Sequence, residues 1–390
     1  MKLRQPLSVI YLHNQRLMGG KAHDIVIMRT CYALAKIGHR VKIITGRPAS
    51  DKDIFEYYGL NPIPGFEIIR IPMWRSRIFS WHAVFNIFCL LKIIELKKKN
   101  AADIIYLREI KLARFLLNFR QLLRLPFAIE IHDLKIKKFY ESCPEKNRDE
   151  DYVFRRVNGI IVLLDTFGKI LQETYKISGI PTVKVPLAAE KIPFECNDCR
   201  KSGQKIIGYI GRLYPMQGVD LLIEAMRYLP DARLSIIGGG ERDITRLKRL
   251  AAGKKVEARV YFHGFVSPGM VSEKAKEADV MVICALDSGK RRYSAHTKLY
   301  EYMAMGKPIV AFDLPSIREE VIDNENALLA RPGDPVSLAE KIAYVLNNQN
   351  VAEKLSGNAY ALADQFSWEK RAARLSDFFY RVYADWQKRK

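Results

Sequence analysis

The sequence predicts an α/β protein with two doubly wound parallel-sheet domains and a closing helix. Three observations indicate this fold class. Short apolar runs alternate with longer segments of helical period, the alternation restarts after a polar stretch near residue 200, and the last segment is strongly amphipathic. The 390 residues leave room for two or three domains of about 100–200 residues each.

Residues 1–195 are predicted to form the first domain. Six short apolar runs have the length and composition of buried strands. They are Leu7–Leu12, Val41–Thr45, Phe66–Ile71, Asp103–Leu107, Phe127–Ile131 and Gly159–Leu164. The helical segments between them are Asp24–Ile37, Ile78–Lys99 and Lys111–Leu123.

The polar, turn-rich segment Glu195–Gln204 is interpreted as a linker, and residues 203–366 as the second domain. The predicted strands here are Lys205–Ile210, Arg233–Ile237, Arg259–Phe262, Asp279–Cys284 and Pro308–Phe312. The predicted helices are Val219–Leu229, Arg242–Ala251, Met270–Ala278 and Thr297–Met305. Ligands of such sheets bind beyond the carboxyl ends of the strands, and two such domains facing each other form a cleft.

The final segment, residues 367–390, is predicted to be an amphipathic helix. Its aromatic residues are too many for a free tail, so we expect it to pack on the protein. They are Trp368, Phe378, Phe379, Tyr383 and Trp386.

Composition excludes several classes of protein. With 48% hydrophobic residues the chain can bury a core, and six Cys are too few for a secreted disulfide scaffold. No run of about 18 uncharged apolar residues predicts a spanning helix, and the N-terminus lacks the pattern of a signal peptide. We therefore expect a soluble, cytoplasmic protein.

The formal net charge is +21, and residues 1–195 contribute +14 of it, from 33 basic and 19 acidic side chains. An anionic membrane, phosphorylated small molecules or nucleic acid would each account for this excess, and so would solubility alone. No nucleic-acid-binding motif is present, so we expect no nucleic-acid partner.

Glycine-containing turns follow three predicted strands and precede helices. They contain Gly19–Gly20, Gly211-Arg212 and Gly238–Gly240. Glycines let the backbone approach a ligand closely, and an Arg at a strand end suits a diphosphate. Taken singly, Gly19–Gly20 is better explained by a tight turn, a surface ion pair explains Arg212 equally well, and Gly238–Gly240 is a weak signal.

A fourth motif opens a predicted helix at Thr297. Lys298 at the helix start suits a phosphate, and Glu301 lies on the same face three residues on. A carboxylate there can accept hydrogen bonds from both hydroxyls of one ribose. The alternative is an ordinary surface Lys–Glu pair.

The ordered set of motifs resembles glycosyltransferase family 4, a retaining group 1 family. The strongest matches are Gly-Arg-Leu…Gly-Val-Asp-Leu-Leu-Ile-Glu-Ala from Gly211 and Lys-Leu-Tyr-Glu-Tyr-Met-Ala-Met-Gly-Lys-Pro from Lys298, with a weaker one over residues 19–41. The resemblance implies the GT-B fold, with two Rossmann-like domains facing a cleft. It also implies that the C-terminal helix, residues 367–390, returns to the first domain.

The resemblance further implies sugar transfer from a UDP- or GDP-linked donor with retention at the anomeric carbon. It needs no metal, no other cofactor and no enzyme nucleophile, because the leaving diphosphate takes the acceptor's proton. Carried over by motif, the catalytic residues are His132, which contacts the sugar, Arg212, which holds the diphosphate, and Glu301, which holds the ribose. The donor-binding set is Gly19, Gly20, Arg212, Gln217, Gly239, Thr297, Lys298, Leu299 and Glu301. A purely structural role is the alternative for His132.

Two positions depart from the family pattern. Gln217 stands where the family usually has Lys, and Tyr293 where it usually has the first Glu of a pair. Lys298, or Arg291 and Arg292, are candidates to replace the missing charge. A nucleotide-sugar epimerase of related architecture, or a homologue that only binds, are the alternative functions.

Two acidic clusters and one cysteine pair are weak metal-site candidates. They are Asp51–Asp53, Asp149–Asp151 and Cys196-x-x-Cys199, and none has the expected strand context or further ligands. We therefore predict no metal site.

The segment Ile78–Leu96 is apolar and aromatic, and basic residues flank it. Arg75 and Arg77 precede it, and Lys97, Lys98 and Lys99 follow it. Such a helix can lie on an anionic membrane surface, and the alternative is a helix packed on the first sheet. We expect a peripheral protein at the inner face of the cell membrane, with a lipid-linked or polysaccharide acceptor.

Overall fold

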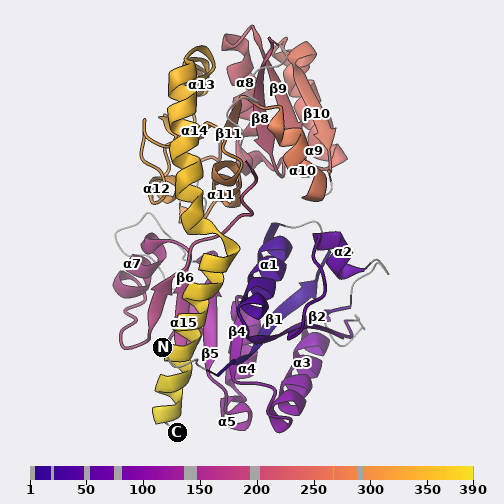
Figure 1. Cartoon of the computed structure of the whole chain (residues 1–390), viewed down its shortest axis with the longest axis vertical. Coiled ribbons are helices and arrows are strands. Elements are labelled where there is room, and N and C mark those ends of the chain that lie inside the picture. The colour runs from indigo at the N-terminus through magenta and orange to yellow at the C-terminus, as the bar shows by residue number, and fades with distance from the viewer. Residues whose placement is uncertain are drawn as a thin grey trace. The chain divides into compact units, whose positions relative to one another are not determined.

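The computed structural model describes residues 5–18, 22–47, 53–73, 81–135, 147–193, 203–266, 268–287 and 293–389. The chain divides into two compact units (Figure 1). Unit 1 comprises Met1–Leu187 and Trp368–Lys390, and unit 2 comprises Ala188–Ser367. The division falls before the predicted linker Glu195–Gln204, most of which lies outside the described residues.

Unit 1 contains a seven-stranded parallel sheet in the order β3-β2-β1-β4-β5-β6-β7. The strands are β1 (Ser8–Arg16), β2 (Arg40–Gly46), β3 (Phe66–Ile71), β4 (Ile104–Leu107), β5 (Phe127–Ile131), β6 (Gly159–Val162) and β7 (Thr182–Lys184). The helices are α1 (Ala22–Lys36), α2 (Ile54–Tyr58), α3 (Trp81–Lys98), α4 (Ile110–Leu117), α5 (Arg120–Leu123), α6 (Arg148–Phe154), α7 (Asp165–Glu173) and α15 (Trp368–Lys388). All six strands predicted for this half are present, and β7 is an additional edge strand.

Unit 2 contains a six-stranded parallel sheet in the order β10-β9-β8-β11-β12-β13. The strands are β8 (Lys205–Ile210), β9 (Ala232–Ile237), β10 (Val260–Gly264), β11 (Val280–Ile283), β12 (Ile309–Phe312) and β13 (Leu328–Ala330). The α-helices are α8 (Val219–Ala225), α9 (Glu241–Gly253), α10 (Pro268–Lys276), α11 (Thr297–Ala304), α12 (Pro315–Arg318), α13 (Pro335–Asn347) and α14 (Gln349–Ala363). The predicted two-domain, doubly wound fold is confirmed.

Two predicted helices differ from the structure. The expected helix Lys111–Leu123 is two helices, because the backbone at Phe119 leaves the helical region (φ −105°, ψ 17°) between α4 and α5. The expected helix Val219–Leu229 ends at Ala225, and the chain continues as a 3₁₀ turn over Met226–Tyr228. Both differences lie at helix ends, where local sequence patterns are least informative.

The C-terminal helix α15 packs on unit 1. Its buried residues recur every three or four positions and form one stripe. They are Trp368, Arg371, Ala372, Leu375, Phe378, Phe379 and Val382. The Phe379 ring lies 5.2 Å from the Tyr106 ring of β4, and Ser376 Oγ lies 2.7 Å from His39 Nε2. The expected return of this helix to the first half of the chain is therefore present in the structure.

Close approach of α15 requires a glycine in β6. A Cβ atom on Gly159 would lie 2.6 Å from Val382 Cγ2 and 2.8 Å from Phe378 Cζ. Contacts this short do not occur between carbon atoms without displacement of one partner. Gly159 therefore permits the close packing of the helix on the sheet.

In both sheets the strand order reverses next to the first strand, between β1 and β4 and between β8 and β11. Ligands of doubly wound sheets bind beyond the carboxyl ends of the strands at such reversals. Within the described residues, no helix is both long and apolar enough to cross a membrane.

Candidate functional site

In unit 2, the turns after β8 and β9 bring two glycine segments together. Gly211 (φ 135°) donates its N–H to Ile237 O, and a Cβ on Gly238 (φ 106°) would lie 2.6 Å from Gly211 O. Gly239 (φ 87°) is equally constrained, because a Cβ there would lie 2.3 Å from Leu213 Cδ1. These positions favour glycine for conformation and for space.

Arg212 follows directly after Gly211 and is exposed beyond the carboxyl end of β8. Its guanidinium donates to the hydroxyl of Tyr214 at 2.7 Å. The backbone of Arg212 is also held, because the buried Tyr209 donates its hydroxyl proton to Arg212 O at 2.9 Å. The guanidinium of Arg212 is therefore exposed to solvent, while the backbone that carries it is held in place.

Lys298 reaches this turn from the start of α11. Its Nζ donates to Gln217 Oε1 at 2.7 Å and lies 4.8 Å from the centroid of the Tyr209 ring. A Cβ on Gly211 would lie 2.5 Å from Lys298 Cε, so the glycine leaves room for the lysine side chain. The ammonium of Lys298 thus lies beside Gln217, the position where the resembled family usually has its own lysine.

Glu301 lies one helical turn beyond Lys298 in α11 and is half-buried. Burial raises the pKa of the Glu301 carboxyl, and the nearby Lys298 ammonium offsets only part of this effect. Thr297 begins the helix, and Leu299 is buried in the core. The helix N-cap is His296, whose side chain makes no capping hydrogen bond.

The structure therefore gathers most of the predicted donor set in one unit. Arg212, Gln217, Gly239, Lys298 and Glu301 come from the turns after β8 and β9 and from the first turns of α11. Two predicted residues, Gly19 and Gly20, lie outside the described part of the chain, and so do Arg291 and Arg292.

His132 belongs to unit 1 and follows β5 directly. Its Nε2 lies 2.5 Å from Glu130 Oε1, so the carboxylate accepts a hydrogen bond from the ring. Glu130 in turn accepts two hydrogen bonds at 2.7 Å from the guanidinium of Arg371 in α15. The hydroxyl of Tyr106 also donates to Glu130. His132 is therefore oriented by a fully buried ion pair.

This network shifts two pKa values. Burial lowers the pKa of His132 to about 4, and the Arg108 cation lowers it further, whereas the Glu130 carboxylate acts in the opposite direction. Burial alone would raise the pKa of Glu130, but Arg371 and His132 outweigh it and hold the pKa well below its usual range. At neutral pH the ring of His132 is uncharged while Glu130 remains ionised.

Arg371 has further partners in unit 1. Its guanidinium donates to the backbone carbonyls of Val185 and Pro186 and to the hydroxyl of Thr30. Sequence reasoning missed the Glu130–Arg371 pair. The available signal was Glu130 itself, a charged residue inside an otherwise apolar strand, because buried carboxylates are almost always paired.

Sequence reasoning also missed a cluster at the end of β1, formed by His13, His23 and Asp24. The apolar run was expected to end at Leu12, but β1 continues to Arg16 and His13 is fully buried.

The acidic segments considered as metal sites in the sequence have other partners in the structure. Asp53 caps α2, and Asp149 pairs with Arg114.

Comparisons with known proteins point to one enzyme class. A family model described as glycosyl transferases group 1 matches residues 197–362. The uncharacterized glycosyltransferase MJ1069 of Methanocaldococcus jannaschii is 27% identical over 259 residues, 64% of this chain and 63% of its own length. A second glycosyltransferase of that organism, MJ1607, is 24% identical over 93% of this chain and 95% of its own. A phosphatidyl-myo-inositol mannosyltransferase of Mycobacterium leprae is 28% identical over 44% of this chain and 45% of its own.

Solved structures share the fold over nearly the whole chain. A glycosyltransferase from Rickettsia africae superposes with a TM-score of 0.76 at 16% identity, covering 97% of this chain and 99% of its own. Anabaena HepE in complex with UDP and glucose superposes with a TM-score of 0.73 at 16% identity, covering 95% and 99%. The chain therefore has the GT-B fold, and its residues 197–362 match the group 1 glycosyl transferases, a class of transferase enzymes.

Proposed function

We propose that this protein is a retaining glycosyltransferase that uses a UDP- or GDP-linked sugar and modifies a lipid-linked or polysaccharide acceptor. The observation that carries the proposal is the cationic site of unit 2. Arg212 and Lys298 converge there on glycine turns at the carboxyl ends of β8 and β9. HepE, a protein of the same fold, was solved with UDP and glucose.

The site suits a diphosphate for two physical reasons. Arg212 offers a planar, bidentate donor set, and Lys298 adds a second positive charge. The first turns of α9 and α11 add N–H groups, since their N-cap residues Gly240 and His296 make no side-chain cap. Lys298 thus supplies the charge that Gln217 does not.

Glu301 suits the ribose of the nucleotide. Its half-buried carboxylate has a raised pKa because burial disfavours the ionised form. Two hydroxyl groups that donate to the carboxylate would relieve this cost, and a ribose carries such a pair. The same residue would discriminate against nucleotides that lack a 2′-hydroxyl.

In the transfer step, the bond between the anomeric carbon and the diphosphate oxygen breaks while the acceptor oxygen bonds to the same face. The acceptor's proton passes to the leaving diphosphate, so no enzyme base is required. Arg212 and Lys298 would stabilise the charge that develops on that group. The uncharged ring of His132 would hydrogen-bond a sugar hydroxyl and orient the donor.

Thermal shift and calorimetry test the donor part of the proposal. They measure how UDP, GDP and the corresponding nucleotide sugars bind to the full chain. We expect Arg212→Ala and Lys298→Met each to weaken nucleoside diphosphate binding at least about 10-fold, with Arg249→Met, an exposed arginine of α9, as a matched cationic control. Unchanged affinity in both variants would overturn the proposed donor site. Release of an epimerised sugar without acceptor would favour an epimerase instead.

The acceptor side of the proposal rests on helix α3. Its exposed residues include Trp81, Ile87 and Leu91, and Lys98 and Lys99 lie at its carboxyl end. Its opposite face packs into unit 1 through Phe85, Cys89 and Ile93, so α3 is both a core helix and an exposed apolar surface. The Mycobacterium leprae relative is named for a lipid acceptor, phosphatidyl-myo-inositol. We therefore propose peripheral binding to the anionic inner face of a membrane.

Part of the predicted basic surface is neutralised locally. Glu95 accepts hydrogen bonds from Lys92 and Lys99, which together lower its pKa to about 2. Lys97 and Lys98 add further positive charge, whereas Arg75 and Arg77 lie outside the described residues.

Cosedimentation with vesicles of phosphatidylglycerol or phosphatidylcholine tests the membrane surface. We expect binding to the anionic vesicles only, and a clear loss when Lys97, Lys98 and Lys99 are changed to Gln or Trp81 to Ala. A control triple variant neutralises the exposed Lys248, Lys276 and Lys388. Equal loss in the control variant would show a general charge effect and refute this surface.

A further inference from the structure

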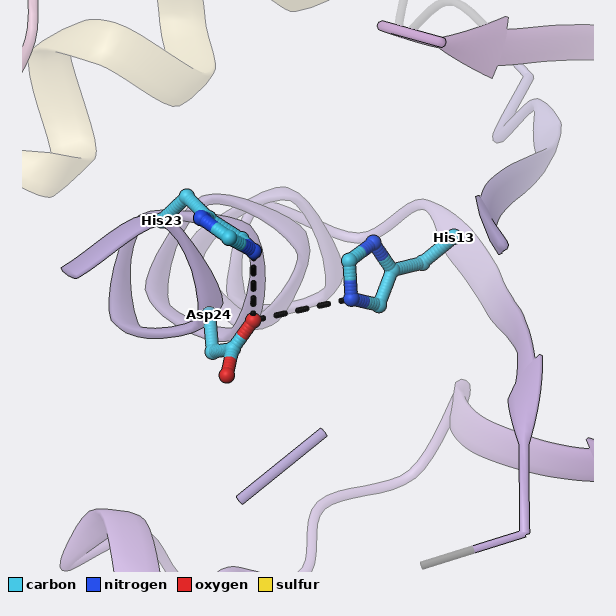
Figure 2. A group of neighbouring side chains, drawn as sticks. All are labelled: His13, His23 and Asp24. Carbon is cyan, nitrogen blue, oxygen red and sulfur yellow. Dashed lines mark ion pairs between the residues drawn. The ribbon is translucent and has the colours of Figure 1, made fainter. Parts of the chain in front are cut away.

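Three side chains of types that ligate metals converge in unit 1, where β1 ends and α1 begins. His13 extends from β1, and His23 and Asp24 come from the first turn of α1 (Figure 2). Asp24 Oδ1 lies between the two rings, 3.0 Å from His23 Nε2 and 3.5 Å from His13 Nε2. We propose that His13, His23 and Asp24 bind a divalent transition-metal ion, best matched by Zn²⁺.

Burial distinguishes this cluster from a chance surface grouping. His13 is fully buried and Asp24 is 1% exposed, while His23 is 26% exposed. Among the described residues, neither ring nitrogen of His13 has a hydrogen-bond partner, and His23 Nε2 has only its ion pair with Asp24 Oδ1. Buried polar atoms are normally satisfied, and an ion at the centre of the cluster would satisfy these nitrogens.

The distances suit a tetrahedral ion. Ligand atoms at about 2.0–2.2 Å from Zn²⁺ lie roughly 3.4 Å from one another. The two separations from Asp24 Oδ1 bracket this value, and the three ligand atoms all lie within 4.8 Å of one another. Two imidazoles with one carboxylate suit Zn²⁺, Fe²⁺ or Co²⁺, whereas Mg²⁺ and Ca²⁺ prefer oxygen ligands.

The charge states also suit a cation. The imidazoles of His13 and His23 can each offer a lone pair to a cation, and their ligand atoms lie together with that of Asp24. The start of a helix by itself disfavours a cation. The carboxylate of Asp24 therefore supplies the negative charge that makes the position favourable.

A bound ion would join the end of β1 to the first turn of α1. The transfer chemistry proposed above needs no metal, so the expected effect is on the stability of unit 1. Metal binding is measured without any sugar nucleotide. The result of that measurement is therefore independent of the proposed transferase activity.

The test uses tag-free, full-length protein that has been stripped of metal by a chelator. We expect one Co²⁺ per chain with the visible absorption of a tetrahedral site, displacement by Zn²⁺, and a raised melting temperature with Zn²⁺ but not with Mg²⁺. His23→Ala is expected to weaken Zn²⁺ binding by more than about 10-fold. The control His82→Ala, an exposed histidine of α3, should bind as the unchanged protein does.

His13 is fully buried, so His13→Gln is the second variant, used with a circular dichroism check of its folding. Unchanged Zn²⁺ affinity in His23→Ala would overturn the proposal. Loss of binding in Cys196→Ser or Cys199→Ser, with His23→Ala unaffected, would assign the metal to the cysteine pair instead and overturn it equally.

Discussion

Replacing Arg371 with Met should destabilise unit 1, because it leaves the buried carboxylate of Glu130 without its main counter-ion. Both oxygens of Glu130 accept hydrogen bonds from Arg371 at 2.7 Å, and both side chains are 2% exposed. Removing one partner of a buried ion pair costs about 3–5 kcal/mol. Loss of the guanidinium also removes the hydrogen bonds that it donates to the carbonyls of Val185 and Pro186, which adds to this cost.

Hydrogen exchange measures the effect unit by unit, which matters because two units need not unfold together. We expect protection of the most stable amides in β5 and α15 to fall by about 100-fold to several thousand-fold, the equivalent of 3–5 kcal/mol. Amides of unit 2 serve as an internal control. Arg381→Met is the matched variant, because Arg381 is an exposed arginine of the same helix.

A second variant isolates the charge from the packing. In Glu130→Gln with Arg371→Met, the buried charge is gone, so we expect part of the lost protection to return. A loss below about 1 kcal/mol for Arg371→Met, or equal to that of Arg381→Met, would refute the reasoning. It would mean that α15 is held by its apolar stripe alone.

Three further predictions follow from the structure. Gly159→Ala should cost unit 1 about 1–3 kcal/mol in urea unfolding, whereas Gly168→Ala, with open space around its Cβ, should cost far less. The pKa of His132 is lowered to about 4, so unit 1 should be most stable above pH 6.5 and lose up to about 3 kcal/mol as the pH falls to 4; His132→Gln should flatten that profile. Gln217→Lys should lower the melting temperature of the free protein, because Lys298 Nζ lies 2.7 Å from Gln217 Oε1, and added UDP should reverse the loss; no change on either count would contradict the role given to Lys298.

Local sequence patterns were sufficient for most of the fold. Runs such as Phe127–Ile131 and Lys205–Ile210 coincide with β5 and β8, because a strand buried on both faces is mostly apolar, and the one buried charge in β5, Glu130, is paired. The motif that begins at Thr297 opens α11 at that residue. Helix ends were less predictable, as at Phe119, where the backbone turns within a continuous apolar pattern.

The candidate site was only partly predictable. The glycine turns and Arg212 follow from their order along the chain, since strand ends of one parallel sheet lie at the same edge. The contact between Lys298 and Gln217 joins residues 81 positions apart, and no pattern in either segment specifies it. The same is true of Glu130 and Arg371, which are separated by 241 positions.

The sequence alone determined two sheets, their alternating helices and the residue types at the strand ends, because these depend on local periodicity and on where glycines are needed. Only the tertiary structure decided which side chains meet. It placed Lys298 beside Gln217, Arg371 on Glu130 behind His132, and His13 against His23 and Asp24. The physical reason is that burial and charge pairing depend on contacts between distant segments. These contacts exist only once the sheets have formed and α15 has packed on unit 1.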